Sequence, residues 1–230
     1  MQFLKDIFHI FFPNLCVHCS IPLVTGEKFL CLECNHQVVP IPYDEYHQKM
    51  LQSTFYGSAV IEQISSYMYF RKATPSQSLI HALKYRGQEA IGTWLAKRVV
   101  KQLQEQHLFE SVTAVMPVPL HSRRLKERGY NQVTAFGTVL ARTLGVVYLT
   151  KVLKRVSTRS SQTILKRFER FSNSDTLFTC EEHALLRDAH ILLVDDVITT
   201  GATLLNCCEQ LYKVGVRKIS ICTMAYTPKE

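Results

Sequence analysis

The sequence predicts an α/β protein in which a parallel sheet with flanking helices follows a small cysteine-rich N-terminal unit. After residue 110, short apolar segments alternate with amphipathic ones, the pattern of strand–helix units in a parallel sheet. Two Cys-x2-Cys pairs precede this region. The 230 residues, 47% of them hydrophobic and 20% charged, suffice for one substantial globular domain with an appendage.

The N-terminal unit contains four cysteines in two pairs, Cys16-x2-Cys19 and Cys31-x2-Cys34. Two such turns present four thiolates as a tetrahedron, the arrangement that binds a structural Zn²⁺. Four protein ligands leave no open coordination position, so a catalytic metal is not expected. The alternative is a set of reduced structural cysteines. His18 and His36 are bystanders unless one of them replaces a cysteine as ligand.

The first residues, MQFLKDIFHIFF, are not a typical signal peptide, because their apolar run is short and no small-residue cleavage site follows. The apolar residues between Phe3 and Phe11 fit one side of a short helix packed on the protein. No apolar run approaches the roughly eighteen residues of a membrane helix. We therefore expect no transmembrane segment and a cytoplasmic location, where eight cysteines favour metal binding or free thiols over disulfides.

The two units are expected to meet near residue 45, where two prolines precede a polar stretch. Residues 1–45 would hold the N-terminal helix and the cysteine knuckle, and residues 46–230 the larger domain. At the start of the larger domain, alternation in residues 55–70 predicts paired strands.

Helical and strand-like segments alternate through the rest of the larger domain. Residues 73–87 predict a helix that begins at Thr74-Pro75 and ends near Gly87. Its last turns contain His81, Lys84, Tyr85 and Arg86. These residues are either functional or part of an ordinary solvent-exposed helix surface. The later segments predict, in order, a strand, a helix, a strand, a helix and a strand: 111–120, 131–145, 189–197, 201–215 and 216–226. Parallel strands joined by right-handed crossovers place ligands at their carboxyl ends.

Two aspartates stand at the carboxyl end of the most apolar of these segments. Ile191–Val194 is expected to be a buried central strand, followed directly by Asp195 and Asp196. The turn after them offers hydroxyls, a close-approaching backbone and a helix N-terminus to an anion: Thr199, Thr200, Gly201, Ala202 and Thr203. Carboxylates beside a phosphate cradle can accept hydrogen bonds from vicinal hydroxyls. The expected ligand is a ribose 5-phosphate group.

Positive charge is concentrated in one part of the chain. Residues 117–171 contain twelve Lys/Arg against two Asp/Glu, a net +10, whereas the whole chain carries +8. Such a run is either a solvated face or a site for a polyanion. Aromatic residues interleaved with it pack in the core or stack on bases: Tyr130, Phe136, Phe168 and Phe171. Residues 151–176 lack periodicity and are expected to form a long mobile loop.

Over about residues 10–226 the sequence resembles the ComF (ComFC) family of competence proteins, which are similar to type I phosphoribosyltransferases. The resemblance rests on motifs in the family's order: the cysteine knuckle, HALKYRG, PVPLHSRRLKERGYNQ, RSSQTILKRFERFSN and ILLVDDVITTGATL. It implies a type I phosphoribosyltransferase-like sheet preceded by a small four-cysteine zinc-binding domain.

The resemblance also implies roles for site residues. Asp195 and Asp196 match the acidic pair that holds the ribose hydroxyls of phosphoribosyl pyrophosphate, and Thr199–Thr203 match the loop around the 5-phosphate. In an enzyme, Mg²⁺ would bridge pyrophosphate and ribose, and the loop after the first core strand would stabilise the leaving pyrophosphate through Arg123, Arg124 and Arg128. A segment that reads an acceptor base is not evident, so the acceptor is unidentified.

Three functions follow, of which DNA handling in natural transformation ranks first, phosphoribosyl transfer second and sensing of phosphoribosyl pyrophosphate third. Single-stranded DNA would be bound by these residues: Arg123, Arg124, Lys126, Arg128, Tyr130, Arg159, Lys166, Arg167 and Arg170. The resemblance further implies a helicase-like ATPase and a single-strand-loading protein as partners, and leaves room for peripheral association with the DNA-uptake channel.

Overall fold

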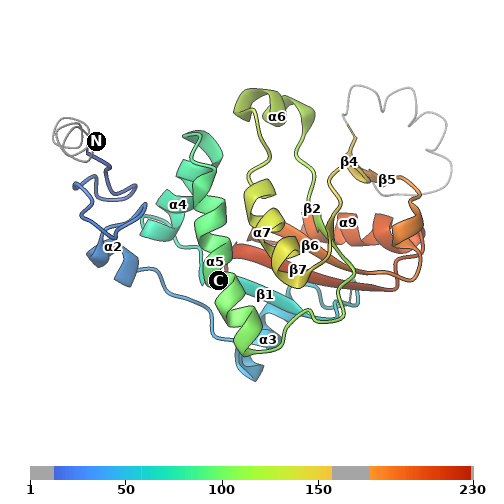
Figure 1. Cartoon of the computed structure of the whole chain (residues 1–230). Helices are drawn as coiled ribbons and strands as arrows, with labels where there is room; N and C mark the ends of the chain where they lie inside the picture. The colour runs from blue at the N-terminus through green and yellow to red at the C-terminus, as the bar shows by residue number, and fades with distance from the viewer. Residues whose placement is uncertain (1–12, 58, 157–176, 229–230) are drawn as a thin grey trace.

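The computed structural model describes residues 13–57, 59–156 and 177–228, and its centre is a five-stranded parallel sheet (Figure 1). The strands lie in the order β1-β7-β6-β2-β3, and every neighbouring pair is parallel. Their bounds are β1 Ile64–Tyr69, β2 Ala114–Pro117, β3 Val147–Tyr148, β6 His190–Ile198 and β7 Lys218–Tyr226. The predicted α/β fold with a parallel sheet is confirmed.

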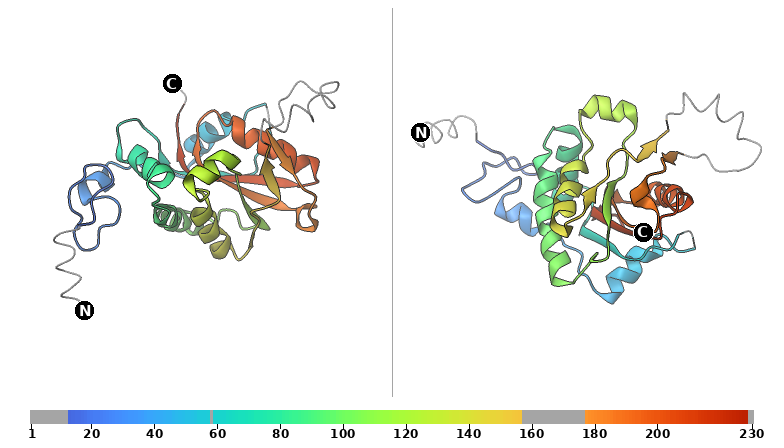
Figure 2. Two further views of the ribbon diagram at one scale, coloured as in Figure 1. Left: turned by 90° about the horizontal axis from the view of Figure 1, so that it is seen from above. Right: turned by 45° about the vertical axis from the view of Figure 1, so that its right-hand side comes forward.

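Helices cover both faces of this sheet. Their bounds are α2 Leu32–His36, α3 Glu45–Ser53, α4 Pro75–Tyr85, α5 Ala90–Glu105, α6 Ser122–Arg128, α7 Thr134–Leu144 and α9 Ala202–Lys213, with a 3₁₀ turn at Ala184–Leu186. Residues of α4, α5 and α7 share one core cluster, and residues of α3 and α9 share another. Figure 2 shows the sheet between these two layers. The helices and strands expected between residues 74 and 226 are present.

β6 lies at the centre of the sheet because its sequence has no polar side. Ile191, Leu192, Leu193 and Val194 are each 0% exposed. Leu192 and Val194 pack in the cluster of α4, α5 and α7, whereas Ile191 and Leu193 pack in the cluster of α3 and α9. A strand covered on both faces requires such an unbroken apolar run. In the described part of the chain, no helix is long and apolar enough to cross a membrane.

Two expectations about strands are wrong. Residues 55–70 contain one strand, β1, which pairs with β7 rather than with a neighbour in sequence. The turn at Gly57, where φ is +73°, separates β1 from the end of α3. β6 also continues to Ile198, so Asp195 and Asp196 lie within the strand, held by pairing with β7, and not after its end.

The basic region has more regular structure than its sequence indicates. The segment after β2, expected to be a loop, contains the two-turn helix α6, which ends at Gly129 with φ +79°. Leu153–Arg155 forms β4, which pairs with β5 (Phe178–Cys180) in a two-stranded antiparallel sheet. The rest of the expected mobile loop and the expected helix at Phe3–Phe11 lie outside the described residues.

The cysteine knuckle packs against α4 and α5. Its buried residues belong to the same core cluster as residues of those helices. The Phe29 ring meets the Trp94 ring edge to face at 5.8 Å, and the Arg98 guanidinium lies 3.6 Å from the Trp94 centroid. Arg98 also donates to Asn35 Oδ1 at 3.1 Å. The knuckle therefore shares a core with the larger domain.

Candidate functional site

Several predicted site residues meet at the carboxyl edge of the sheet. β2 leads from this edge into α6, β1 into α4, and β6 into the turn before α9 (Figure 1). Because all these strands are parallel, the three connections begin at the same edge of the sheet. The structure thus brings the acidic pair, the Thr199–Thr203 turn and α6 to one edge, as the sequence predicts.

Both carboxylate oxygens of Asp196 are engaged. Lys84 Nζ of α4 lies 2.9 Å from Oδ1, and Gln132 Nε2 donates to Oδ2 at 2.6 Å. Arg128 donates in turn to Gln132 Oε1 at 2.7 Å. Asp196 is 5% exposed, so these contacts balance the cost of burying its charge. Asp196 therefore ties α4 to the segment that follows α6, and vicinal hydroxyls would have to displace one of these partners.

Asp195 is the more accessible member of the pair and has the more unusual ionisation. Desolvation and the adjacent charge of Asp196 raise its pKa well above the ordinary value for aspartate. Its Oδ1 accepts the backbone N–H of Asp196 at 2.8 Å, and the charges of Lys84 and Arg155 act in the opposite direction. A carboxyl group with a strongly raised pKa is common at functional sites.

The turn after β6 has the features of an anion cradle. Thr199, Thr200 and Ala202 are exposed. The N-cap of α9, Gly201, has no side chain to cap the helix, and the Ala202 N–H donates to Thr200 Oγ1 at 3.4 Å. Gly201 is also required by packing within the fold. Its φ is +77°, and a Cβ there would lie 2.9 Å from Thr54 Cγ2. Glycine is therefore required because the turn packs against the end of α3.

The basic residues of α6 project from the same edge. Arg123, Arg124 and Lys126 are exposed, and Arg123 Nε lies 2.8 Å from Glu127 Oε1. Arg128 is half-buried and donates a hydrogen bond to Gln132. The hydroxyl of Tyr130 donates to the Leu83 carbonyl, so this side chain joins the segment after α6 to α4.

The four predicted metal ligands also come together. The sulfur atoms of Cys16, Cys19, Cys31 and Cys34 all lie within 4.8 Å of one another, and Cys19 Sγ is 3.7 Å from Cys31 Sγ. Around a tetrahedral Zn²⁺ with Zn–S bonds of about 2.3 Å, sulfur atoms lie about 3.8 Å apart. These side chains could bind a metal ion, and the donor set fits zinc.

The knuckle thiols differ in how readily they ionise. Burial opposes ionisation of Cys16, but hydrogen bonds from the backbone of Cys19 and Cys31 lower its pKa to about 6. Burial and the neighbouring thiols raise the pKa of Cys34. A cation would remove this asymmetry, because ligation deprotonates every cysteine.

Some predicted residues lie elsewhere. Phe136 is 0% exposed, which confirms core packing over base stacking. Four predicted DNA ligands and two aromatic residues are outside the described part of the chain: Arg159, Lys166, Arg167, Arg170, Phe168 and Phe171. Sequence reasoning did not identify Lys84 and Gln132 as partners of Asp196. Their signal was membership in the HALKYRG and RGYNQ motifs, without any indication that these segments meet.

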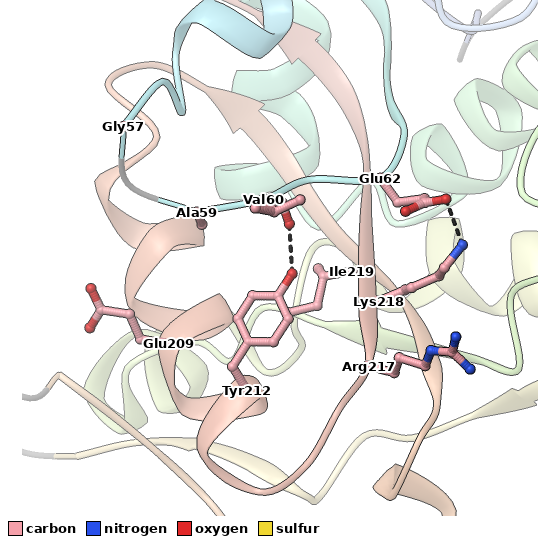
Figure 3. A pocket seen from close by; sticks show the side chains of 9 residues that line it. All are labelled: Gly57, Ala59, Val60, Glu62, Glu209, Tyr212, Arg217, Lys218 and Ile219. Atoms are coloured by element: carbon pink, nitrogen blue, oxygen red, sulfur yellow. Dashed lines mark hydrogen bonds and ion pairs between the residues drawn. The ribbon is translucent and has the colours of Figure 1, made fainter.

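A larger hollow than any space described at this edge lies at the opposite edge of the sheet. It measures about 560 Å³ and is lined by residues near the amino ends of β1 and β7 and by α9 (Figure 3). Inside it Lys218 pairs with Glu62 at 2.7 Å, and Tyr212 donates to the Val60 carbonyl at 2.6 Å. Its charged side chains are two acids and two bases, so the hollow has no excess charge for a phosphate.

Comparison with known proteins agrees with this geometry. A family model, the phosphoribosyl transferase domain, matches residues 88–230. The chain is 30% identical over 227 residues to competence protein F of Haemophilus influenzae, covering 94% of this chain and 98% of that protein. It is 27% identical over 230 residues to the DNA utilization protein YhgH of Salmonella typhimurium, with the same coverage.

Solved structures with related folds include the APRTase of Giardia lamblia in complex with 9-deazaadenine, at 19% identity and a TM-score of 0.40, covering 64% of this chain and 71% of that one. Another is the adenine phosphoribosyltransferase of Thermoanaerobacter pseudethanolicus, at 15% identity and a TM-score of 0.37, covering 68% and 87%. The chain belongs to the ComF family of competence proteins, with a phosphoribosyltransferase domain preceded by a four-cysteine cluster.

Proposed function

We propose that this protein takes part in DNA uptake during natural transformation and binds single-stranded DNA through the carboxyl edge of its phosphoribosyltransferase domain. The competence and DNA utilization proteins to which it is similar support the pathway. As part of the proposal, the protein works in the cytoplasm with a helicase-like ATPase and a single-strand-loading protein, and contacts the DNA-uptake channel peripherally.

The observation that carries the proposal is the position of α6. This helix carries the exposed cations Arg123, Arg124 and Lys126 and follows β2 at the edge of the sheet where β6 leads into the Thr199–Thr203 turn. Clustered Lys and Arg bind phosphates by releasing counterions. The turn before α9 and the N-terminus of that helix present backbone N–H groups and a partial positive charge to a further phosphate. A single strand can contact both features, since its phosphates repeat along a flexible chain.

The zinc ion is a structural element of this proposal. Held by Cys16, Cys19, Cys31 and Cys34, it would neutralise the thiolates and fix the knuckle against α5. Cys16→Ser should reduce the zinc content of the purified protein and its thermal stability. Metal content and melting temperature equal to those of the unchanged protein would show that the cysteines have no metal-binding role.

The DNA-binding proposal is tested by salt dependence and by neutralising α6. Arg123→Gln, Arg124→Gln and Lys126→Gln together should weaken binding of a labelled oligo-dT about tenfold or more at about 0.1 M salt. The slope of log affinity against log salt should fall by about 2, since each lost phosphate contact removes about 0.7 in single strands. Fluorescence anisotropy over a salt series measures both quantities.

A matched control removes the same charge elsewhere. Lys49→Gln, Lys97→Gln and Lys101→Gln lie on α3 and α5, and all three residues are exposed. This triple variant should retain most of the affinity. Equal losses in both variants would show a general effect of net charge and would contradict a site on α6.

A second candidate function, phosphoribosyl transfer, is favoured by the acidic pair beside the turn of α9. Asp195 and Asp196 would accept hydrogen bonds from the ribose hydroxyls, and Arg124 and Arg128 would bind the pyrophosphate. Mg²⁺ would supply charge neutralisation on the pyrophosphate when bound. In the present arrangement Lys84 forms an ion pair with Asp196. A ribose hydroxyl would have to displace Lys84 from that carboxylate in order to bind.

Release of pyrophosphate from phosphoribosyl pyrophosphate tests this function. Candidate acceptors would be supplied with Mg²⁺, and the unchanged protein compared with Asp195→Asn/Asp196→Asn. Release that depends on the aspartates would establish an enzyme. If no acceptor supports release, DNA binding or sensing of the ligand remains. Transformation frequency of a strain carrying the double replacement measures whether the turn matters to DNA uptake.

A further inference from the structure

A small cavity lies between the end of α4 and α6. It measures about 200 Å³ and is lined by Lys84, Tyr85, Arg124, Glu127 and Arg128. Three of these side chains are cations and one is a carboxylate, so an anionic ligand is favoured. Sites that enclose a complete small molecule measure about 300–1,000 Å³. The cavity is therefore suited to one part of a larger anionic ligand.

Tyr85 is the aromatic wall of this cavity. The residue is 64% exposed, so core packing does not explain it. The Arg128 guanidinium carbon lies 4.9 Å from its ring centroid, and the His81 ring centroid, on the preceding turn, is also 4.9 Å away. An exposed ring supported by an arginine is a stacking platform for a base, and such stacking tolerates every sequence.

Two of the three cations that line the cavity, Lys84 and Arg128, are held in place by Asp196. Lys84 contacts Asp196 directly, and Arg128 reaches it through Gln132. These bonds fix two side chains that would otherwise lose rotational freedom when a ligand binds. The Lys84–Asp196 contact also places the cavity beside the acidic pair. Arg124 is exposed on α6 and completes the wall.

We propose that this cavity binds one nucleotide unit of single-stranded DNA, with its base stacked on Tyr85 and its phosphate beside Lys84 and Arg124. The inference rests on the proposed DNA-binding function and adds a residue, Tyr85, that distinguishes single strands from duplexes. Bases in a duplex are already stacked on one another and are not available to the ring. The exposed charges of α6, in contrast, attract both forms.

Binding of an oligo-dT and of an abasic oligonucleotide of the same length tests the proposal. The unchanged protein should bind oligo-dT more tightly, because both strands carry the same phosphates. Tyr85→Ala should weaken oligo-dT binding about tenfold and bring its affinity to that of the abasic strand, with the salt slope unchanged. Tyr85→Phe should stay within about twofold of the unchanged protein. Tyr56→Ala removes another exposed tyrosine, 90% exposed at the end of α3, and should have no effect.

A second measurement uses the unchanged protein and does not depend on the folding of a variant. An oligonucleotide carrying 5-iododeoxyuridine should form a photochemical crosslink with Tyr85, located by mass spectrometry. Equal affinity of Tyr85→Ala and the unchanged protein for oligo-dT, or crosslinks that avoid α4, would overturn the inference. In that case salt-dependent binding of oligo-dT by the unchanged protein would still support the proposed function. If the unchanged protein binds no DNA at low salt, both fail.

Discussion

The two edges of the sheet each carry a hollow, and the smaller one has the chemistry of a binding site. At the amino edge about 560 Å³ is lined by two acids and two bases, including the Glu62–Lys218 pair. At the carboxyl edge about 200 Å³ is lined by three cations and one acid, with Asp196 beneath them. Volume alone does not identify a phosphate site. The excess of positive charge at the carboxyl edge, held by the buried Asp196, is what favours a phosphate there.

The largest contrast between the edges should appear when one acid is removed from each. Asp196→Ala leaves Lys84 and Gln132 without their shared partner, and it should lower the free energy of unfolding by about 3–5 kcal/mol. Glu62→Ala breaks a pair whose side chains are 39–40% exposed and should cost at most about 1 kcal/mol. Urea denaturation measures both. Equal costs would show that Asp196 is not held more tightly than a surface acid.

A smaller contrast is expected between two glycines with similar backbone angles. Gly201 and Gly57 have φ of +77° and +73°, so alanine costs about 1–2 kcal/mol at either position. At Gly201 the new Cβ would also meet Thr54 and Phe55, adding about 1–3 kcal/mol, whereas no atom of the described residues beyond the chain neighbours lies within 4 Å of a Cβ at Gly57. Thermal melts of the two variants should therefore separate. A Gly57→Ala variant as unstable as Gly201→Ala would contradict the packing of the phosphate turn on α3.

The smallest contrast concerns pH. The pKa of Asp195 is raised by burial and by Asp196, so the folded protein holds this proton more tightly than the unfolded chain. Its contribution to stability is complete below about pH 4 and is lost as pH rises toward the raised pKa. Asp195→Asn should therefore raise the melting temperature at pH 7, with a difference that shrinks toward pH 4.

Glu62 should show the opposite sign. A hydrogen bond from Lys218 lowers its pKa, so its contribution is present above about pH 4 and is lost as pH falls. Glu62→Gln should lower the melting temperature slightly at pH 7 and have no effect in acid. Melting curves of both variants from pH 4 to pH 8 check the two signs. Differences of the same sign would show that the Asp195 carboxyl is not destabilised by its surroundings.

Most of the sheet could be predicted because its strands have local signals in the sequence. The run Ile191–Val194 is apolar on both faces, which only a covered central strand explains. The β1 error has a physical cause, since alternation in residues 55–70 indicates a strand but not its partner. That partner, β7, lies more than 150 residues away in the sequence.

The site was predictable in its residues and less so in its contacts. Asp195, Asp196 and the turn to Thr203 form one continuous motif, although the two aspartates lie within β6 and not after its end. The bond from Lys84 to Asp196 joins segments 112 positions apart, and only the fold of α4 over the sheet brings them together. Gln132 is a similar case. The motif that contains it was visible in the sequence, but its hydrogen bond to Asp196 was not.

The contact between the knuckle and α5 has an optical consequence. The chain contains one tryptophan, Trp94, and its indole lies between the Phe29 ring and the Arg98 guanidinium. Fluorescence excited selectively at this indole therefore comes from a single point, the seam where the cysteine knuckle meets the larger domain. Detachment of the knuckle would expose the indole to water and shift its emission to longer wavelength. The protein thus carries an intrinsic reporter of whether its knuckle is seated.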